Sequence, residues 1–477
     1  MRKLLLLTAL LFALTPVFSQ HIEDTLSTVY WCPNDTFKIR FKDEPKLSIF
    51  TASRKDKISP GTDAYPGEYV VFYFGNDSLK VNYHNNLPYA HNIYLNFASP
   101  KGKTTLRFHF NYRTAHFSNE YIIKHKDRVR YDIPEVYELA NIIWTLSPSG
   151  QRSEDPYKTG DYYQRVVNYF KPWMNHPVFK QLNFPDSVVA MEYYNFRENS
   201  FAFNIDGKAA AKGKVKLLYN GPYYYVFGDE LADSSLFGRL KPLVEDFANK
   251  SNFRKFYREN KSFYDQQAAR AEKLLPMRAM WQWLEKNFPN NKYQSYRVVF
   301  SPLIGGSHST QRYSTWQGDV RFGENVMFVC GPERYDSSRV LSEKQKEGLY
   351  SGVVFTEIDH NYVNPATNKY AKKVDSIFSQ RAIWTIRSSS ADFYGNAVSV
   401  FNEYMTHAAF CVYVEDVYDA ATAAFVIGKR EDMMVDRRGF IRFREFNQEL
   451  LKLYRENKDK PLASFYPQLL EWCARQQ

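Results

Sequence analysis

The sequence has few cysteines and, beyond its first residues, no long apolar run. Cys32, Cys330, Cys411 and Cys473 are too far apart to form a Cys-x-x-Cys zinc or redox motif. Their spacing leaves two alternatives open, one or two disulfides or single buried thiols. No later stretch reaches the roughly 18 apolar residues of a membrane-spanning helix. We therefore expect no integral membrane span.

Blocks of basic residues and low-complexity tracts are also absent. The formal charge of +11 is spread thinly along the 477 residues. A nucleic-acid-binding arm would concentrate about five or six basic residues in one block, so we predict no nucleic-acid partner. Hydrophobic residues make up 44% of the chain, which is enough for a sizeable core. The basic excess is then best interpreted as a solvated surface.

The first residues have the three parts of a secretory signal. Arg2-Lys3 is followed by an apolar run from Leu4 to Leu14 and by a cleavage-site pattern at Val17-Phe18-Ser19. This predicts a signal peptide over residues 1–19 and a mature chain that begins at Gln20. No cysteine stands at the cleavage point, which argues against a lipid anchor there. We expect a secreted or periplasmic protein.

The length of the chain favours several domains, and its patterns favour an α+β fold. Residues 20–130 alternate short β-rich runs with turn residues, which predicts an antiparallel, sandwich-like β domain. Residues 131–290 are predicted to mix helices and strands, with strands over 187–228. Residues 291–477 are predicted to form the functional domain. Within it, Val326 to Cys330 is predicted as a strand whose edge could pair with an extended substrate.

One stretch of this last domain, Val353 to Pro365, has the residues of a catalytic helix. A capping box formed by Ser342 and Gln345 predicts a helix that begins there and runs to about Tyr362. Asn364-Pro365 is predicted to stop it. The β-branched and aromatic residues from Val353 onward leave a strand that ends near Glu357 as the alternative.

On such a helix, Glu357 and His360 lie three residues apart and point to the same side. A second helix is predicted from about Ala397 to Tyr418, because apolar residues recur there at helical spacing. It carries Asn402-Glu403 and places Glu403, His407 and Cys411 at steps of four. Two carboxylates and two imidazoles could therefore meet between the two helices.

The region from Thr356 to Pro365, followed by Phe401-Asn402-Glu403-Tyr404, resembles the glutamate-zincin metallopeptidases. It is most similar to a secreted bacterial family of unknown function with the motif His-Glu-Phe-x-His-x-x-Val-Asn-Pro. The resemblance implies a zincin-like fold for residues 291–477, a bound zinc ion and a peptide or protein substrate. It also implies that Glu357 is the general base, and that His360 and Glu403 are zinc ligands.

The first ligand position of that motif is occupied by Thr356, whose hydroxyl is a poorer zinc ligand than imidazole. Two histidines are candidates to replace the missing imidazole. His407 lies one helical turn after Glu403, which is a fixed relationship. His308 lies in the loop Gly305-Gly306-Ser307-His308-Ser309, which could fold over the site. The expected metal site is therefore His360, Glu403 and His407, with His308 as the alternative to His407.

Three functions follow as hypotheses. The first is a zinc-dependent hydrolase of peptide or amide bonds, in which Glu357 deprotonates a zinc-bound water. The second is a catalytically inactive pseudo-peptidase that serves as a binding or scaffold module in the cell envelope. The third, less favoured, is a glycan-binding protein that uses the many aromatic residues.

Overall fold

The computed structural model describes residues 28–41, 48–53, 69–82, 91–110, 115, 117–223, 226–227, 232–317, 320–387 and 389–476. The predicted signal peptide lies outside these residues. The chain divides into two compact units, residues 1–113 and 114–477. Both helices and small sheets are present, which confirms the α+β class. The regions 131–290 and 291–477 lie together in the second unit.

The first unit contains two sheets. One has the strand order β1-β6-β7 and the other β3-β2-β4-β5. Neighbouring strands pair in antiparallel fashion, except that β1 pairs in parallel with β6. The strands are β1 (Val29–Trp31), β2 (Thr36–Phe41), β3 (Ser48–Thr51), β4 (Tyr69–Phe74), β5 (Asp77–Asn82), β6 (His91–Ser99) and β7 (Gly102–Phe110).

The two sheets share one core because apolar residues alternate along their strands. Phe37 and Ile39 of β2 are buried, and Lys38 between them is exposed. The same two-residue period places Leu95 and Phe97 of β6 in that core. The rings of Phe37 and Phe97, from different sheets, stack with their centroids 4.7 Å apart. This arrangement agrees with the predicted sandwich-like domain.

The second unit is built on a four-stranded sheet of order β12-β13-β11-β8. Its strands are β8 (Arg128–Asp132), β11 (Ser295–Ser301), β12 (Ser309–Gln317) and β13 (Val320–Cys330). The strand predicted at Val326 to Cys330 forms, but it is not at an edge. It pairs in parallel with β11 and antiparallel with β12. The edge position next to the site therefore belongs to β12, and the proposed edge pairing through Val326 to Cys330 is wrong.

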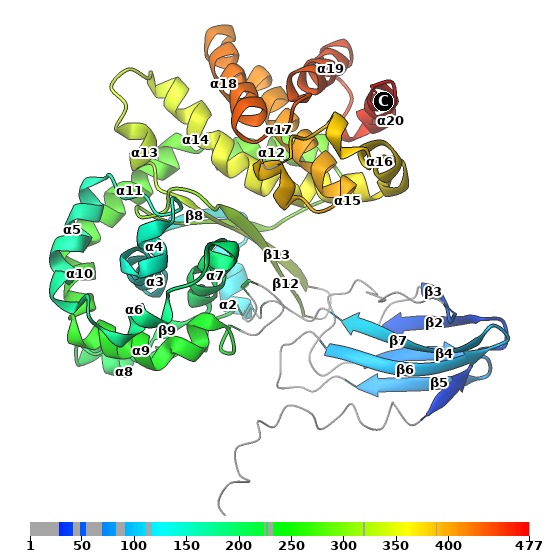
Figure 1. The fold of residues 1–477 in the computed structure, drawn as a ribbon, viewed down its shortest axis with the longest axis horizontal. Coiled ribbons are helices and arrows are strands. Elements are labelled where there is room, and N and C mark those ends of the chain that lie inside the picture. The colour runs from blue at the N-terminus through cyan, green and yellow to red at the C-terminus, as the bar shows by residue number, and fades with distance from the viewer. Residues whose placement is uncertain are drawn as a thin grey trace, which may run out of the picture. The chain divides into compact units, whose positions relative to one another are not determined.

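Helices cover both faces of this sheet (Figure 1). One set comes from before β11, and the other consists of α12 and the helices that follow β13. The first set is α2 (Asn119–His125), α3 (Glu135–Leu146), α4 (Pro148–Arg152), α5 (Asp161–Phe170), α6 (Pro177–Gln181), α7 (Asp186–Asn199), α8 (Gly207–Ala211), α9 (Leu236–Lys250), α10 (Phe253–Glu259) and α11 (Lys261–Leu274). Helix α12 (Met277–Asn287) precedes β11 but lies with the second set, where its Trp283 ring packs near the rings of Phe355 and Tyr413. The rest of the second set is α13 (Glu333–Asp336), α14 (Glu343–Ile358), α15 (His360–Asn368), α16 (Ala371–Phe378), α17 (Ala397–Val417), α18 (Ala420–Asp432), α19 (Phe443–Glu456) and α20 (Tyr466–Ala474).

The prediction of strands over residues 187–228 is wrong for most of that stretch. Residues up to Asn199 form helix α7, which follows Pro185 and has Asp186 in its first turn. The only strand pair in the described part of the stretch joins β9 (Asn204–Ile205) to β10 (Leu217–Leu218). Because the apolar pattern of α7 is weak, it is the packing of this segment against α3 and α9 that stabilises it as a helix.

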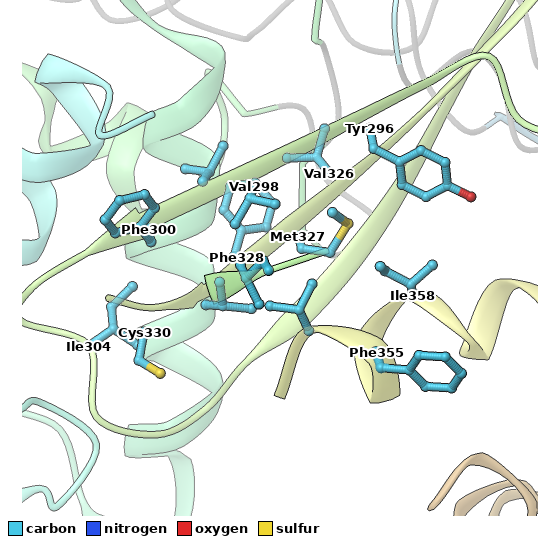
Figure 2. Packing of buried hydrophobic residues seen from close by; sticks show 14 of the residues in the cluster. Tyr296, Val298, Phe300, Ile304, Val326, Met327, Phe328, Cys330, Phe355 and Ile358 are labelled. Carbon is cyan, nitrogen blue, oxygen red and sulfur yellow. The ribbon is translucent and has the colours of Figure 1, made fainter. Parts of the chain in front are cut away.

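Helix α14 forms as predicted, and the alternative strand does not. The hydroxyl of Ser342 accepts a hydrogen bond from the Gln345 backbone N–H over 3.2 Å, and the Gln345 side chain accepts one from the Ser342 N–H over 3.0 Å. This reciprocal capping box begins the helix. The ring of Phe355 in α14 packs near the rings of Trp283, Phe410 and Tyr413. Figure 2 shows Ile358 of the same helix on the side of Met327 in β13 and Tyr296 in β11. The side of α14 that carries Ile358 thus packs on the sheet.

The prediction that Asn364-Pro365 stops the helix is wrong, because α15 continues to Asn368 with Pro365 inside it. Proline lacks the N–H that would bond to the carbonyl four residues earlier, here that of Asn361. The hydroxyl of Tyr293 donates a hydrogen bond to this carbonyl over 3.3 Å. The tertiary contact therefore satisfies the group that proline leaves without its helical partner.

All four cysteines are buried free thiols, which decides between the two alternatives for them. Burial raises the pKa of the Cys330 thiol to about 12, so this thiol is un-ionised at neutral pH. None of the helices in the described parts of the chain has both the length and the apolar character needed to cross a membrane.

Candidate functional site

The candidate site lies between the α14–α15 pair and α17. Residue 359 separates α14 from α15, but its backbone is helical and its N–H bonds to the Phe355 carbonyl over 2.9 Å. The turn is therefore continuous, and Thr356 and His360 lie one above the other on the same face. Asn396 caps α17 by accepting a hydrogen bond from the Ser399 N–H over 2.8 Å.

A cavity of about 330 Å³ opens at this place, and every residue that lines it is polar. All the site residues that the sequence pointed to take part, and the structure brings them together from three segments of the chain. The lining residues are His308, Thr356, Glu357, His360, Asn364, Tyr394, Ser399, Asn402, Glu403, His407 and Arg438.

Glu403 is the centre of the polar contacts in this cavity. One of its carboxylate oxygens lies 3.3 Å from Nε2 of His360 and the other 3.5 Å from Nε2 of His407. Arg438 donates a hydrogen bond to Oε2 of Glu403 over 2.8 Å. Burial by itself would raise the pKa of Glu403, but Arg438 and the two imidazoles outweigh it and hold the pKa well below its usual range. Glu403 is therefore a carboxylate.

The carboxylates around His360 favour the protonated form of its imidazole. Burial opposes the positive charge of this form, but the hydrogen bond to Glu403 and the nearby carboxylates raise the pKa of His360 to about 10. Its other ring nitrogen, Nδ1, lies 3.4 Å from Oδ1 of Asn364 and 3.5 Å from the Thr406 hydroxyl. This imidazole would have to lose a proton before Nε2 could bind a metal.

His407 lies between two arginines. Its Nδ1 is 3.0 Å from Nη1 of Arg430, and its Nε2 contacts Nη1 of Arg438. Burial and the two guanidinium charges lower the pKa of His407 to about 3, although Glu403 acts to raise it. The ring is therefore neutral and has one lone pair, which faces a guanidinium.

Arg438 reaches the cavity through an unusual turn. A π-helical turn, Met433–Arg437, follows α18 and ends at Arg438, and Gly439 follows Arg438 with φ at +79°. A side chain at that φ is strained, and a Cβ there would clash with the Ser389 side chain. The Ala391 N–H donates to the Arg438 carbonyl over 3.0 Å. The guanidinium also donates to the hydroxyl of Tyr394.

Glu357 and Thr356 line the cavity beside these charges. Burial, with a further contribution from Glu403, raises the pKa of Glu357 to about 7 although His360 and Arg438 act in the opposite direction. The Thr356 hydroxyl donates to the Gly352 carbonyl over 2.8 Å. This back-bond within the helix uses the hydroxyl proton and does not orient the oxygen as a ligand.

His308 reaches the cavity from a loop that is anchored on both sides. The Gly305 and Gly306 N–H groups donate to the Asp155 carbonyl over 2.7 and 2.9 Å. Arg197 of α7 donates to the carbonyl of Ser307 over 2.8 Å. Burial and nearby arginines lower the pKa of His308 to about 3. Its Nε2 has no hydrogen-bond partner among the described residues.

These side chains do not fit a zinc ion as they stand. Zinc needs neutral imidazoles and carboxylates whose lone pairs converge at about 2 Å from one point. Here the ring of His407 faces two arginines, and Arg438 bonds to Glu403. In the described parts of the chain, no group of three or more His, Cys, Asp or Glu side chains is arranged to hold a metal. Neither His407 nor His308 completes a ligand set with His360 and Glu403.

No family model, no curated protein and no solved structure matches this chain. The site is therefore interpreted from its own geometry.

Sequence reasoning missed three residues that decide the chemistry of the site: Arg438, Arg430 and Tyr394. None of them belongs to a motif, and Arg438 is 35 residues from Glu403 in the chain. The one sequence signal near Arg438 was Gly439. A glycine directly after a helical segment often takes a left-handed conformation and ends the helix. That signal marks a turn but does not say where the preceding side chain points.

Proposed function

We propose that this protein is an exported pseudo-peptidase: it has a site like that of the glutamate zincins, binds no metal there, and uses the cavity to bind a small polar ligand. The observation that carries the proposal is the contact of Arg438 with Glu403. A guanidinium bonds to the carboxylate that the zincin resemblance makes a zinc ligand. Arg438 supplies the positive charge that buried Glu403 needs, and no metal is required for that purpose.

The shape and lining of the cavity support a binding role. Its volume of about 330 Å³ is at the lower end of the range for small-molecule sites. Because all its lining residues are polar, an apolar ligand would leave buried polar groups unpaired, at a cost of about 1–3 kcal/mol each. A ligand rich in hydrogen-bonding groups, such as an amino acid, a short peptide or a sugar, would satisfy them.

The test is the metal content of purified residues 20–477, measured by elemental analysis before and after exposure to excess zinc and removal of free metal. We expect substoichiometric zinc in both samples, and the same result for His360→Ala. Binding is tested on the same protein by thermal shift with free amino acids, dipeptides and N-acetylated sugars. One tightly held zinc per chain that is lost in His360→Ala would refute the proposal.

A zinc peptidase is the second candidate, and one observation favours it. Glu357 has a pKa of about 7 and lines the same cavity as His360 and Glu403, as a general base should. This candidate requires zinc-dependent hydrolysis of a peptide substrate that disappears in Glu357→Gln. If added zinc produces no such activity, the peptidase candidate is ruled out and only the binding role is left.

Export is part of the proposal and has its own test. The mature chain recovered from a secreting host should begin at Gln20, as measured by intact mass and N-terminal sequencing. Recovery of the unprocessed chain from the cytoplasm would contradict it.

A further inference from the structure

We infer that Arg438 takes the place of a metal ion in this site, and that Thr356 and Arg438 together keep zinc out. Replacing both residues should then create a zinc site from His360, Glu403 and the imidazole introduced by Thr356→His. This inference rests on the proposed function, since it assumes that the unchanged protein binds no zinc.

The spacing of His360 and Glu403 is the first observation in favour. Two donor atoms on one tetrahedral zinc, each bonded at about 2.0–2.1 Å, lie roughly 3.3–3.4 Å apart. Nε2 of His360 lies 3.3 Å from Oε1 of Glu403. These two atoms already have the separation of neighbouring ligands. His360 would lose its proton on binding, as histidine ligands do.

The position of Thr356 is the second observation. It lies one turn before His360 on a continuous helical turn, and both line the same cavity. An imidazole at position 356 would therefore lie on the same face as His360, in the i, i+4 arrangement of zinc-binding helices. Among the described residues, the Thr356 hydroxyl bonds to the helix carbonyls of Gly352 and Val353. Its replacement should break no hydrogen bond outside the helix.

The third observation is that Arg438 is firmly held, so added zinc should not simply push it aside. Its guanidinium donates to Glu403 and Tyr394 and contacts His407. Its backbone carbonyl accepts a hydrogen bond from Ala391. A divalent ion next to this guanidinium would be repelled in a poorly solvated cavity, where charges interact more strongly than in water. Restoring the histidine without removing Arg438 should therefore be insufficient.

The experiment compares the unchanged protein with Thr356→His, Arg438→Gln and the double variant, all as full mature chains. Zinc binding is measured by calorimetry, and cobalt is used as a second probe because its absorption spectrum reports coordination geometry. We expect the double variant to bind one zinc at least about 100-fold more tightly than Thr356→His alone, and to give a four- or five-coordinate cobalt spectrum. Equal affinity in Thr356→His and the double variant would overturn the inference.

A matched charge control is Thr356→His combined with Arg437→Gln, which removes a neighbouring exposed arginine. This control, like Thr356→His with Arg438→Lys, should bind zinc no better than Thr356→His alone. If the double variant with glutamine does not fold by circular dichroism, Arg438→Met replaces it, because methionine refills the volume without charge. A folded double variant that binds no zinc would overturn the inference and leave the proposed function intact, whereas stoichiometric zinc in the unchanged protein would refute the proposed function itself.

Discussion

Arg438 donates a hydrogen bond to Oε2 of Glu403 across 2.8 Å, and this contact joins the turn after α18 to the first half of α17. The Glu403 side chain is only 5% exposed and that of Arg438 is 21% exposed. The pair is therefore well shielded from water, and breaking it leaves a charge without its partner. The contact determines the chemistry of the cavity and should also contribute to the stability of the second unit.

The first prediction concerns this contact. Glu403→Gln removes the carboxylate that Arg438 and His360 share, so it should lower the free energy of unfolding by about 3–5 kcal/mol. The measurement is urea unfolding at pH 7. Glu415→Gln is the control, because Glu415 pairs with a largely exposed Arg455 and should cost at most about 1 kcal/mol. If both variants lost the same unfolding free energy, the Glu403 contact would stabilise the protein no more than an exposed ion pair does.

The second prediction concerns the ion pair that anchors the His308 loop. Arg197 and Glu198 are fully buried, with Nη2 of Arg197 2.8 Å from Oε1 of Glu198. Arg197→Met leaves the Glu198 carboxyl without its countercharge and should cost about 3–5 kcal/mol. Adding Glu198→Gln to that variant should recover part of the loss, because no buried charge then remains. A double variant as unstable as the sum of the single variants would contradict this interpretation.

The third prediction concerns pH. Glu138 is buried, and burial raises the pKa of its carboxyl from 4.5 to about 7 although the hydroxyl of Tyr162 donates to it over 2.6 Å. Folding thus favours the protonated form. The stabilisation is complete below about pH 4.5 and is lost as the pH rises through 7, with a total of about 3 kcal/mol.

Glu138→Gln keeps a neutral side chain of the same shape and cannot titrate. The difference in unfolding free energy between the two proteins, measured by urea titration from pH 4.5 to 8.5, should therefore shift in favour of the variant as the pH rises. A difference that does not change with pH would mean that Glu138 titrates normally.

The fourth prediction concerns Gly352, whose carbonyl accepts the hydrogen bond of Thr356. A Cβ there would clash with the Arg430 guanidinium and lie 2.8 Å from Cζ of Phe410. Gly352→Ala should therefore destabilise the protein by about 1–2 kcal/mol, since overpacking exceeds the gain in helix propensity. Gly428→Ala, in α18 with open space around it, should stabilise it by up to about 1 kcal/mol. Thermal unfolding of both variants distinguishes the two effects.

Local sequence signals were sufficient to predict part of the fold. The capping box at Ser342 and the apolar spacing from Ala397 onward predicted α14 and α17 close to their observed bounds, since both patterns act within one or two turns. Alternating apolar residues in the first unit likewise predicted its strands. Local patterns gave wrong predictions where a contact with a distant part of the chain determines the local structure. Tyr293 satisfies the carbonyl that Pro365 leaves without a helical partner, and sheet order places β13 between two other strands.

For the site, the sequence by itself determined which residues share a helical face. Thr356 with His360, and Glu403 with His407, are placed on a common face by helix geometry alone. Packing of α14 and α15 against α17 then brings both pairs to one cavity. Only the tertiary structure decided the charges there. Arg438 and Arg430 come from beyond α17, and the path of Arg438 depends on a π-helical turn and on Gly439. Electrostatic interactions act through space between distant segments, so no local pattern could show that a guanidinium bonds to the carboxylate where a metal was expected.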